Sequence, residues 1–398
     1  MRRQSAEAGA SRPHRVAFYN NPTVRGAAYQ LALLVALLWF GYEFALNAKA
    51  NLEAQRITSG FGFLGNTAGF GVNQSLIPYS ETDTYGRVFL VGLLNTLLVS
   101  GLGIALATIL GFLIGIARLS PNWLLARLAG GYVELIRNLP LLFQILFWYL
   151  AVLGTLPNPR QAVSLFGGVF LTNRGIILPA PVAGEGSIYV FAALMLAIIA
   201  TCALARWARR RLERTGRQFP TFRAGAALII GLPLMALIAT SFPIGIERPE
   251  LRGFNFVGGM RLVPEFVALL VALVTYTAAF IAEVVRAGIL AVPRGQTEAA
   301  QALGFRRGKT LRLIVVPQAL RVIVPPLTNQ YLNLTKNSSL AVAIGYPDLF
   351  AVFAGTALNQ TGQAIEIIVI TMAVYLSISL LTSLAMNWYN ARVRLSER

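Results

Sequence analysis

The sequence predicts an all-α integral membrane protein with about eight transmembrane helices. Hydrophobic residues make up 56% of the 398-residue chain, charged residues only 13%, and the mean hydropathy is +0.63. A soluble domain carries about 25% charged residues. The apolar residues also gather in runs long enough to cross a bilayer, which needs roughly 20 residues per helix. These observations exclude a water-soluble globular enzyme.

Eight apolar runs are long enough to span the membrane. They lie at 29–46, 88–117, 139–156, 187–205, 224–242, 263–286, 313–334 and 363–389. Between the first two runs, residues 51–84 are rich in Gly, Asn, Ser and Thr and have no helical periodicity. We expect this segment to form a loop on the outer side.

The basic residues predict the orientation of the chain. Lys and Arg total 34 and Asp and Glu 16, which gives a net charge of +18. With a cytoplasmic N-terminus, 24 basic residues fall in cytoplasmic segments and eight in outer ones, while Arg321 and Lys336 lie in a span. Basic residues are retained on the cytoplasmic side. The pattern therefore predicts cytoplasmic termini and favours a membrane protein over a nucleic-acid-binding one.

Cysteine and histidine are nearly absent from the chain. The one cysteine, Cys202, lies in an apolar run, and the one histidine, His14, lies near the N-terminus. A disulfide framework needs paired cysteines, and thiolate or histidine metal clusters need several ligands. The sequence therefore predicts no metal site and no histidine-based catalysis.

Glycines in the second apolar run predict close helix packing. Gly101, Gly103, Gly111 and Gly115 lie in this run, and the last two are four residues apart. Small residues at that spacing let helix backbones approach closely in lipid. We expect this helix to pack tightly against another span.

A polar hairpin at 293–309 interrupts the apolar pattern. Pro293 suits the start of a helix, and Gly304 suits the left-handed residue that ends one. A basic second helix is expected from about Arg306. Glu298 stands among alanines, which would let a partner approach closely and pair its Arg or Lys with the carboxylate. A solvated amphipathic loop remains the alternative.

The string from Gly304 to Thr310 resembles a phosphate-binding loop only superficially. Such a loop has four residues between its glycines and follows a strand, whereas this string has three and follows an expected helix. The chain is therefore not expected to hydrolyse ATP. A membrane-bound enzyme that binds nucleotide through Lys309 is the alternative that this string leaves open.

Several motifs resemble those of a known transporter family. The string from Glu298 through Gly304, followed by Pro317, resembles the EAA loop in permease subunits of ATP-binding-cassette (ABC) importers. Around it, VPRGQTEAAQALG, VVPQALRVIVPPLTNQYLNLTKNSSL and IRNLPLLFQ resemble the polar amino acid branch, which includes the histidine, glutamine and glutamate permeases. The N-terminal extension and an insertion resemble the larger permease of the general L-amino acid or glutamate/glutamine/aspartate/asparagine systems.

The resemblance implies a type I ABC importer permease core and a division of the chain into functional segments. The permease domain would cover 87–390, with the insertion near 157–262. The remaining segments would be a cytoplasmic tail at 1–28, an extra first transmembrane helix and periplasmic loop at 29–86, a cytoplasmic coupling (EAA) loop at 287–312 and a cytoplasmic tail at 391–398.

The resemblance also implies a function and a set of partners. The chain would carry polar L-amino acids from a periplasmic binding protein across the bacterial inner membrane into the cytoplasm. Its partners would be a second, related permease and two cytoplasmic ATPases, which would bind ATP and Mg²⁺, while this chain would bind no cofactor. The ATPase-coupling residues would be Gly295, Glu298, Ala299, Ala300 and Gly304. The alternative is an ion-coupled secondary amino acid transporter that works without an ATPase.

Polar residues within the spans mark a possible substrate path and gate, because charges in a membrane are costly and usually face a cavity or partner. Lys336 could alternatively extend to the head groups, and amides often join neighbouring helices. Glu283 and Arg286, three residues apart, are inner-gate candidates that could alternatively pair only with each other. The substrate-path candidates are Asn95, Gln144, Asn329, Asn333, Lys336, Ser338 and Ser339.

Overall fold

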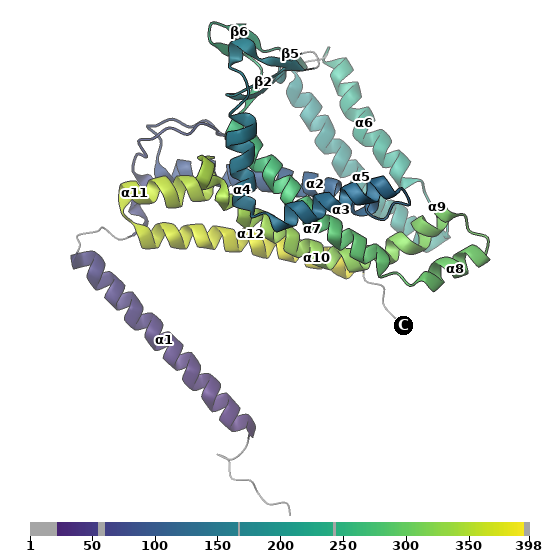
Figure 1. Cartoon of the computed structure of the whole chain (residues 1–398), viewed down its shortest axis with the longest axis horizontal. Helices are drawn as coiled ribbons and strands as arrows, with labels where there is room; N and C mark the ends of the chain where they lie inside the picture. Colours follow the sequence, from purple (N-terminus) through teal and green to yellow (C-terminus); the bar gives the residue numbers. More distant parts are fainter. Residues whose placement is uncertain (1–21, 55–59, 166–167, 242–243, 394–398) are drawn as a thin grey trace, which may run out of the picture.

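The computed structural model describes residues 22–54, 60–165, 168–241 and 244–393 (Figure 1). Within these ranges, seven helices are long and apolar enough to cross a membrane, or up to eight if one bent helix pair counts as a span. The prediction of an all-α membrane fold is confirmed. Six of the spanning segments are single helices: α1 (Pro22–Ala54), α2 (Tyr85–Ala117), α5 (Ser187–Thr215), α6 (Thr221–Ala239), α7 (Pro264–Leu290) and α12 (Ala364–Val393).

The third expected span, 139–156, corresponds to the second half of a bent helix pair rather than to a single straight helix. Helix α3 (Trp123–Asn138) meets α4 (Leu141–Leu146) and η3 (Phe147–Leu153) at a bend of 106°. Pro140 causes the break, because proline removes a helix hydrogen bond and pushes the preceding residue out of the helical region. Leu139 accordingly has extended backbone, with φ −98° and ψ 130°.

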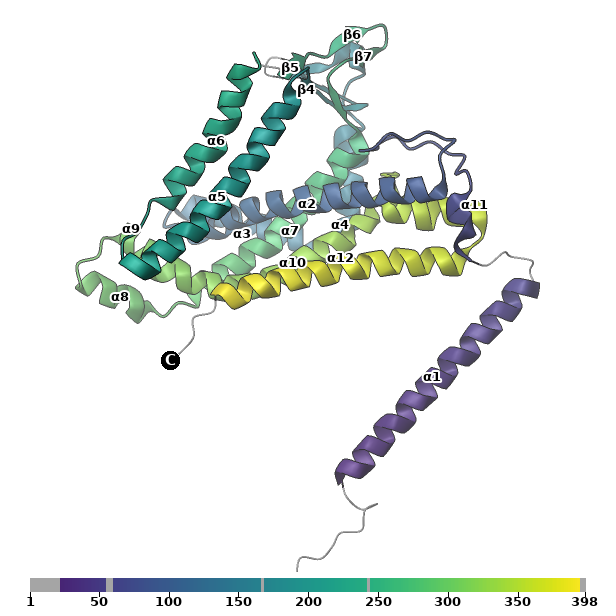
Figure 2. The ribbon, with the colours of Figure 1, turned by 180° about the vertical axis from the view of Figure 1, so that it is seen from behind.

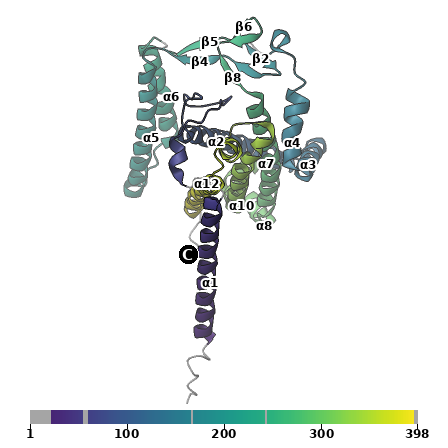
Figure 3. The ribbon, with the colours of Figure 1, turned by 90° about the vertical axis from the view of Figure 1, so that its left-hand side faces the viewer.

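The two ends of the chain are more helical than expected. Helix α1 begins at Pro22, so 22–28 of the expected N-terminal tail is helical, and α12 includes 391–393 of the C-terminal tail. Residues 1–21 and 394–398 lie outside the described residues. Helix α1 projects away from the rest of the molecule in all three views (Figures 1, 2 and 3), and none of its spanning window is buried.

The seventh span is longer than expected and continues directly from the polar hairpin. A single helical span of 38 residues runs from Arg307 to Ile344. The 293–309 region forms α8 ahead of the span and contributes the start of α9, the first turn of the span, and two short helical segments lead from the span to α12. In chain order these elements are α8 (Arg294–Ala302), α9 (Arg307–Thr310), η5 (Leu311–Val315), α10 (Val316–Asn337), η6 (Ser338–Ile344), η7 (Phe350–Ala357) and α11 (Leu358–Thr361).

The core forms where α2, α7 and α10 pack together. A Cβ placed on Gly111 would lie 2.6 Å from the Cβ of Ile281 on α7, and Gly103 and Gly115 are similarly crowded. Close packing at these three glycines is confirmed. It was wrong for Gly101, which faces open space. The largest buried cluster includes Val99, Ala107, Leu269, Leu273, Ile281, Ile323 and Leu334.

The insertion forms an antiparallel helix hairpin, α5 and α6, joined to short strands. Strand β4 pairs with β5 and β3 with β8, so the two ends of the insertion meet at one end of the hairpin. Strands were not expected; in the β3–β8 and β4–β5 pairs the two partners lie on opposite sides of the α5–α6 hairpin in the sequence. The strands are β1 (Val163–Leu165), β2 (Val169–Thr172), β3 (Gly175–Leu178), β4 (Ala180–Ala183), β5 (Ile244–Glu247), β6 (Glu250–Arg252), β7 (Asn255–Val257) and β8 (Met260–Leu262).

The strands and the polar hairpin lie at different ends of the molecule. Figures 1 and 2 show the strands at the top of the molecule and α8, α9 and the end of α12 at the far end of the bundle. Seen from the side, the α5–α6 hairpin stands apart from α3, α4 and α7, with the strands across the top (Figure 3). Two further short helices lie in the connecting segments: η2 (Phe61–Gly65) and η4 (Pro159–Gln161).

Candidate functional site

Helix α8 ends in a well-formed Schellman motif. Gly304 has a φ of +80°, and its N–H donates to the carbonyl of Gln301 at 2.9 Å. The N–H of Phe305 donates to the carbonyl of Ala300 at 3.0 Å. These two bonds define the motif, whose left-handed position favours glycine. The prediction that Gly304 ends this helix is confirmed, and the motif fixes the direction in which the chain turns into α9.

Helix α8 presents its small and acidic residues on one exposed face. Gly295, Glu298 and Ala299 are exposed and lie three and four positions apart, which places them on the same side of a helix. Ala300 is only 2% exposed, on the side where α8 packs against α9 and η5. Ala300 therefore does not lie on the exposed face of α8. Its small side chain instead allows close packing within the hairpin.

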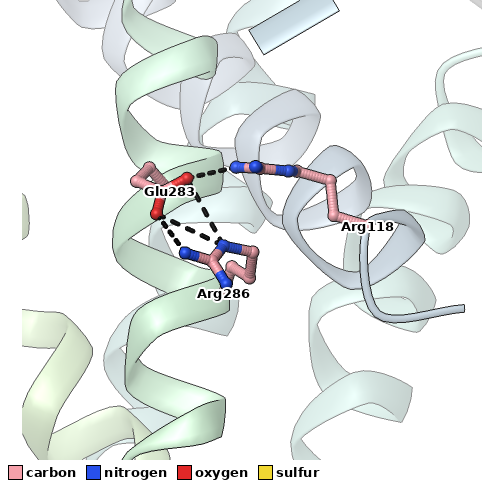
Figure 4. A network of polar contacts seen from close by, with 3 residues as sticks. All are labelled: Arg118, Glu283 and Arg286. Carbon is pink, nitrogen blue, oxygen red and sulfur yellow. Dashed lines mark hydrogen bonds and ion pairs between the residues drawn. The ribbon is translucent and has the colours of Figure 1, made fainter. Parts of the chain in front are cut away.

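A three-residue ion-pair network joins α2 to α7 near the start of the polar hairpin (Figure 4). Arg286 Nη2 lies 2.6 Å from Glu283 Oε1, so the expected pairing is confirmed. The other carboxylate oxygen of Glu283 accepts a hydrogen bond from Arg118, the residue that ends α2. Sequence reasoning missed Arg118, because local spacing cannot reveal a partner so far away in the chain. One half-buried carboxylate thus holds two helices together.

Helix α10 has one buried apolar face and one exposed polar face. Ile323, Leu327 and Leu334 belong to the core cluster. Asn329, Asn333 and Lys336 are exposed at spacings of four and three residues, which aligns them along the helix. Among the described residues, Lys336 has no ion pair and the two Asn side chains have no hydrogen bond. We call these three residues the polar stripe of α10.

Asn95 and Gln144 lie inside the protein rather than on the polar stripe. The amide of Asn95 donates to the carbonyls of Gln74 and Pro347, both at 2.9 Å. The amide of Gln144 donates to the carbonyl of Leu139, and to another near the end of α3, at 3.0 Å. It thereby satisfies backbone groups that the break at Pro140 leaves without helical partners. Both side chains therefore stabilise the fold.

The hydroxyls of Ser338 and Ser339 each donate to a backbone carbonyl nearby in the chain. The Ser338 hydroxyl, which is fully buried, donates to the carbonyl of Thr335 at 2.8 Å. The Ser339 hydroxyl donates to the carbonyl of Lys336 at the same distance. Both bonds close the end of α10, so the hydroxyls are occupied by their own helix.

Sequence reasoning also missed a fully buried carboxylate, Asp348. Its Oδ1 accepts from the N–H of Ala351 at 2.8 Å, and its Oδ2 accepts from the hydroxyl of Tyr375 at 3.1 Å. The residue thus starts the η7 segment and ties it to α12. An acidic residue directly ahead of an apolar run was the sequence signal, since such residues satisfy the free N–H groups at helix starts.

Comparisons with known proteins place these features in context. The family model described as "Binding-protein-dependent transport system inner membrane component" matches residues 223–395. The chain is 55% identical to the putative amino-acid ABC transporter permease protein YhdX of Escherichia coli, covering 96% of this chain and 97% of the relative.

Two further relatives match over nearly the whole chain. The general L-amino acid transport system permease protein AapQ of Rhizobium johnstonii is 53% identical, with 96% of each chain covered. The glutamate/glutamine/aspartate/asparagine transport system permease protein BztB of Rhodobacter capsulatus is 45% identical, with 92% of each covered. The similarity therefore includes the α5–α6 insertion as well as the polar hairpin.

Proposed function

The chain belongs to the amino-acid ABC transporter permeases, and on this premise we propose that it carries polar L-amino acids from a periplasmic binding protein into the cytoplasm with a second, related permease. It is a multi-pass inner-membrane transport subunit, and the ATPase activity of such transporters lies in separate subunits. The observation that carries the finer proposal is the polar stripe of α10, which has no partner within the described chain.

The polar stripe suits one wall of a path for a zwitterion. An exposed cation within a span is costly unless it faces water or a partner. Opposite a second permease, Lys336 would attract the substrate carboxylate, and the amides of Asn329 and Asn333 would donate and accept hydrogen bonds. The amide nitrogens of Asn95 and Gln144 and the hydroxyls of Ser338 and Ser339 already donate to backbone carbonyls, so the proposed path rests on the three residues of the polar stripe.

The exposed face of α8 suits a contact with an ATPase. Gly295 and Ala299 leave room for close approach, and Glu298 offers a carboxylate to a partner Arg or Lys. Gly304 would hold this face at a fixed angle. ATP and Mg²⁺ would bind to the ATPases. Pro293 connects α8 to α7, and α9 and η5 connect it to α10, so movement of α8 would reach both helices. This movement would drive transport only if the ATPase binds the two conformations of the permease unequally.

The ion-pair network suits an inner gate. Glu283 bridges Arg118 at the end of α2 and Arg286 on α7, just ahead of the polar hairpin. Displacing α7 relative to α2 would break the contact with Arg118 and leave the pairing with Arg286 intact. In this proposal α8 and both termini face the cytoplasm, and the strands face the periplasm and the binding protein.

Reconstitution tests the proposal. The chain, a related permease and the ATPase would be placed in vesicles with the binding protein, and uptake of radiolabelled L-glutamate and L-glutamine measured. Lys336→Met should lower uptake about tenfold, because the substrate carboxylate loses its cation. The control Arg248→Met removes an exposed cation in the insertion and should leave uptake unchanged.

Two results would contradict the proposal. One is unchanged uptake in Lys336→Met, which would remove the polar stripe from the path. The other is ion-driven uptake by the chain without an ATPase, which would indicate a secondary transporter.

A further inference from the structure

The α5–α6 hairpin concentrates positive charge at one end. Between residues 187 and 241 the basic residues are all arginines, and Glu213 is the single acidic residue. Six of these arginines are exposed, and none forms an ion pair among the described residues. The seven arginines of the hairpin are Arg206, Arg209, Arg210, Arg211, Arg214, Arg217 and Arg223, and Arg211 is the one that is partly buried.

The position of the arginines matches the level of lipid head groups. The apolar part of α5, residues 187–205, is about 28 Å long at 1.5 Å per residue, close to the thickness of a bilayer core. Arg206 is the next residue, so α5 becomes basic where the hydrocarbon ends. Trp207 and Phe222 are exposed at the same end, 48% and 87% respectively. Tryptophan is enriched at membrane interfaces.

A groove lies between α5 and α6 at this end. Its volume is about 360 Å³. Phe219 contacts Trp207 edge-on, with ring centroids 5.4 Å apart, and the Arg211 guanidinium lies 5.3 Å from the Trp207 ring. These contacts brace the turn between the helices. The groove has an apolar wall and a polar rim, formed by Ala205, Ala208, Leu212 and Phe219 and by Arg209, Gln218 and Thr221.

The sides of the hairpin are apolar and uncovered. Only 11% of the spanning window of α5 and 6% of that of α6 is buried. No hairpin residue belongs to the three buried clusters. Large side chains such as Phe191, Ile199 and Ile230 are at least 60% exposed. Acyl chains could therefore lie along the hairpin while a head group reaches the groove.

We propose that the groove between the basic ends of α5 and α6 binds the phosphate of an anionic phospholipid. The arginine fork donates paired hydrogen bonds to phosphate oxygens, and a basic pocket between helix ends at a membrane surface matches this head group. The surrounding arginines also attract the net negative charge of such a lipid. A zwitterionic lipid has no net charge. The site is independent of the transported substrate.

Native mass spectrometry of the assembled transporter in mild detergent tests this site. Phosphatidylglycerol or phosphatidylcholine of the same acyl composition would be added, and bound lipid counted. The variant Arg206→Gln/Arg209→Gln removes two charges three positions apart beside the groove. The control Arg127→Gln/Arg248→Gln removes two exposed charges elsewhere.

We expect the unmodified chain and the control to retain phosphatidylglycerol in preference to phosphatidylcholine, and the groove variant to bind it about tenfold more weakly. Equal retention by the groove variant would overturn the proposal, as would equal retention of both lipids by the unmodified chain. Loss of an ATPase subunit from the groove variant, with lipid retention unchanged, would assign the arginines to a protein contact instead. None of these results depends on uptake, so they separate this site from the proposed transport function.

Discussion

Helices α7 and α5 are similar in length, and each contains an apolar window long enough to span a membrane, but they differ in what surrounds them. Helix α7 has 27 residues and α5 has 29, and both are apolar enough to span a membrane. Half of the spanning window of α7 is buried, against 11% for α5. Hydropathy identifies both helices as spans, but it does not show which one belongs to the core and which one faces lipid.

Small residues explain the difference. Helix α7 contributes buried alanines to the contact with the glycines of α2, and it also carries Glu283, which bonds to both α2 and its own helix. Helix α5 instead exposes large side chains such as Ile188 and Phe191. In lipid, tight association depends on close backbone approach and polar contacts. In the proposed coupling, the contacts of the core would transmit movement from α8, whereas the α5–α6 hairpin exposes large apolar side chains.

The largest effect should come from filling a glycine in the core. Gly111→Leu should destabilise the protein by about 3 kcal/mol, because a side chain there would overlap Ile281. Gly231→Leu on α6 should have little effect, since nothing lies within 4 Å of a Cβ at that position. Thermal unfolding of the purified assembly in detergent measures both. Equal losses of stability in the two variants would show that the α5–α6 hairpin is packed as tightly as the core.

A charge reversal on α8 should have the next largest effect. Glu298→Lys should lower ATP-driven uptake at least about tenfold, because it places a cation where a partner cation is expected. Glu213→Lys reverses an equally exposed glutamate on the hairpin and should leave uptake unchanged. Uptake and ATPase co-purification should fall together. Normal co-purification and uptake in Glu298→Lys would contradict a docking role for α8.

The smallest effect should come from neutralising one carboxylate in each region. Glu283→Gln should cost about 2 kcal/mol, because Arg118 and Arg286 lose a charged hydrogen-bond partner. Glu250→Gln breaks a strand ion pair whose side chains are about 70% exposed, and it should cost less than about 0.5 kcal/mol. Unfolding measurements compare the two variants. If Glu283 acts at a gate, the Glu283→Gln variant should also show ATPase activity that no longer depends on the binding protein.

The sequence was most informative where the pattern is local. The apolar runs predicted seven spans that the structure contains. Gly304 predicted the end of α8, and the spacing of Glu283 and Arg286 predicted their ion pair. Each of these features depends on residues within one helix or one turn. Hydropathy and helix-ending rules are sufficient for such features.

Features that depend on distant parts of the chain were missed. Arg118 pairs with a residue on another helix, and β4 pairs with β5 across the whole hairpin. The break at Pro140 was also missed, because the apolar run following it was interpreted as a complete span without the amphipathic α3 that precedes it. The burial of Ala300 was missed for the same reason, because the sequence does not show which alanine of α8 packs against α9 and η5.

Thiol labelling tests the proposed position of α8 most directly. In a Cys202→Ala background, which removes the chain's one cysteine, Glu298→Cys and Arg252→Cys would be exposed separately to a membrane-impermeant maleimide. We expect Arg252→Cys to react in intact spheroplasts, and Glu298→Cys to react only in inside-out vesicles stripped of ATPase, with added ATPase blocking the reaction. Labelling of Glu298→Cys from outside intact spheroplasts would place α8 in the periplasm and contradict its role in coupling.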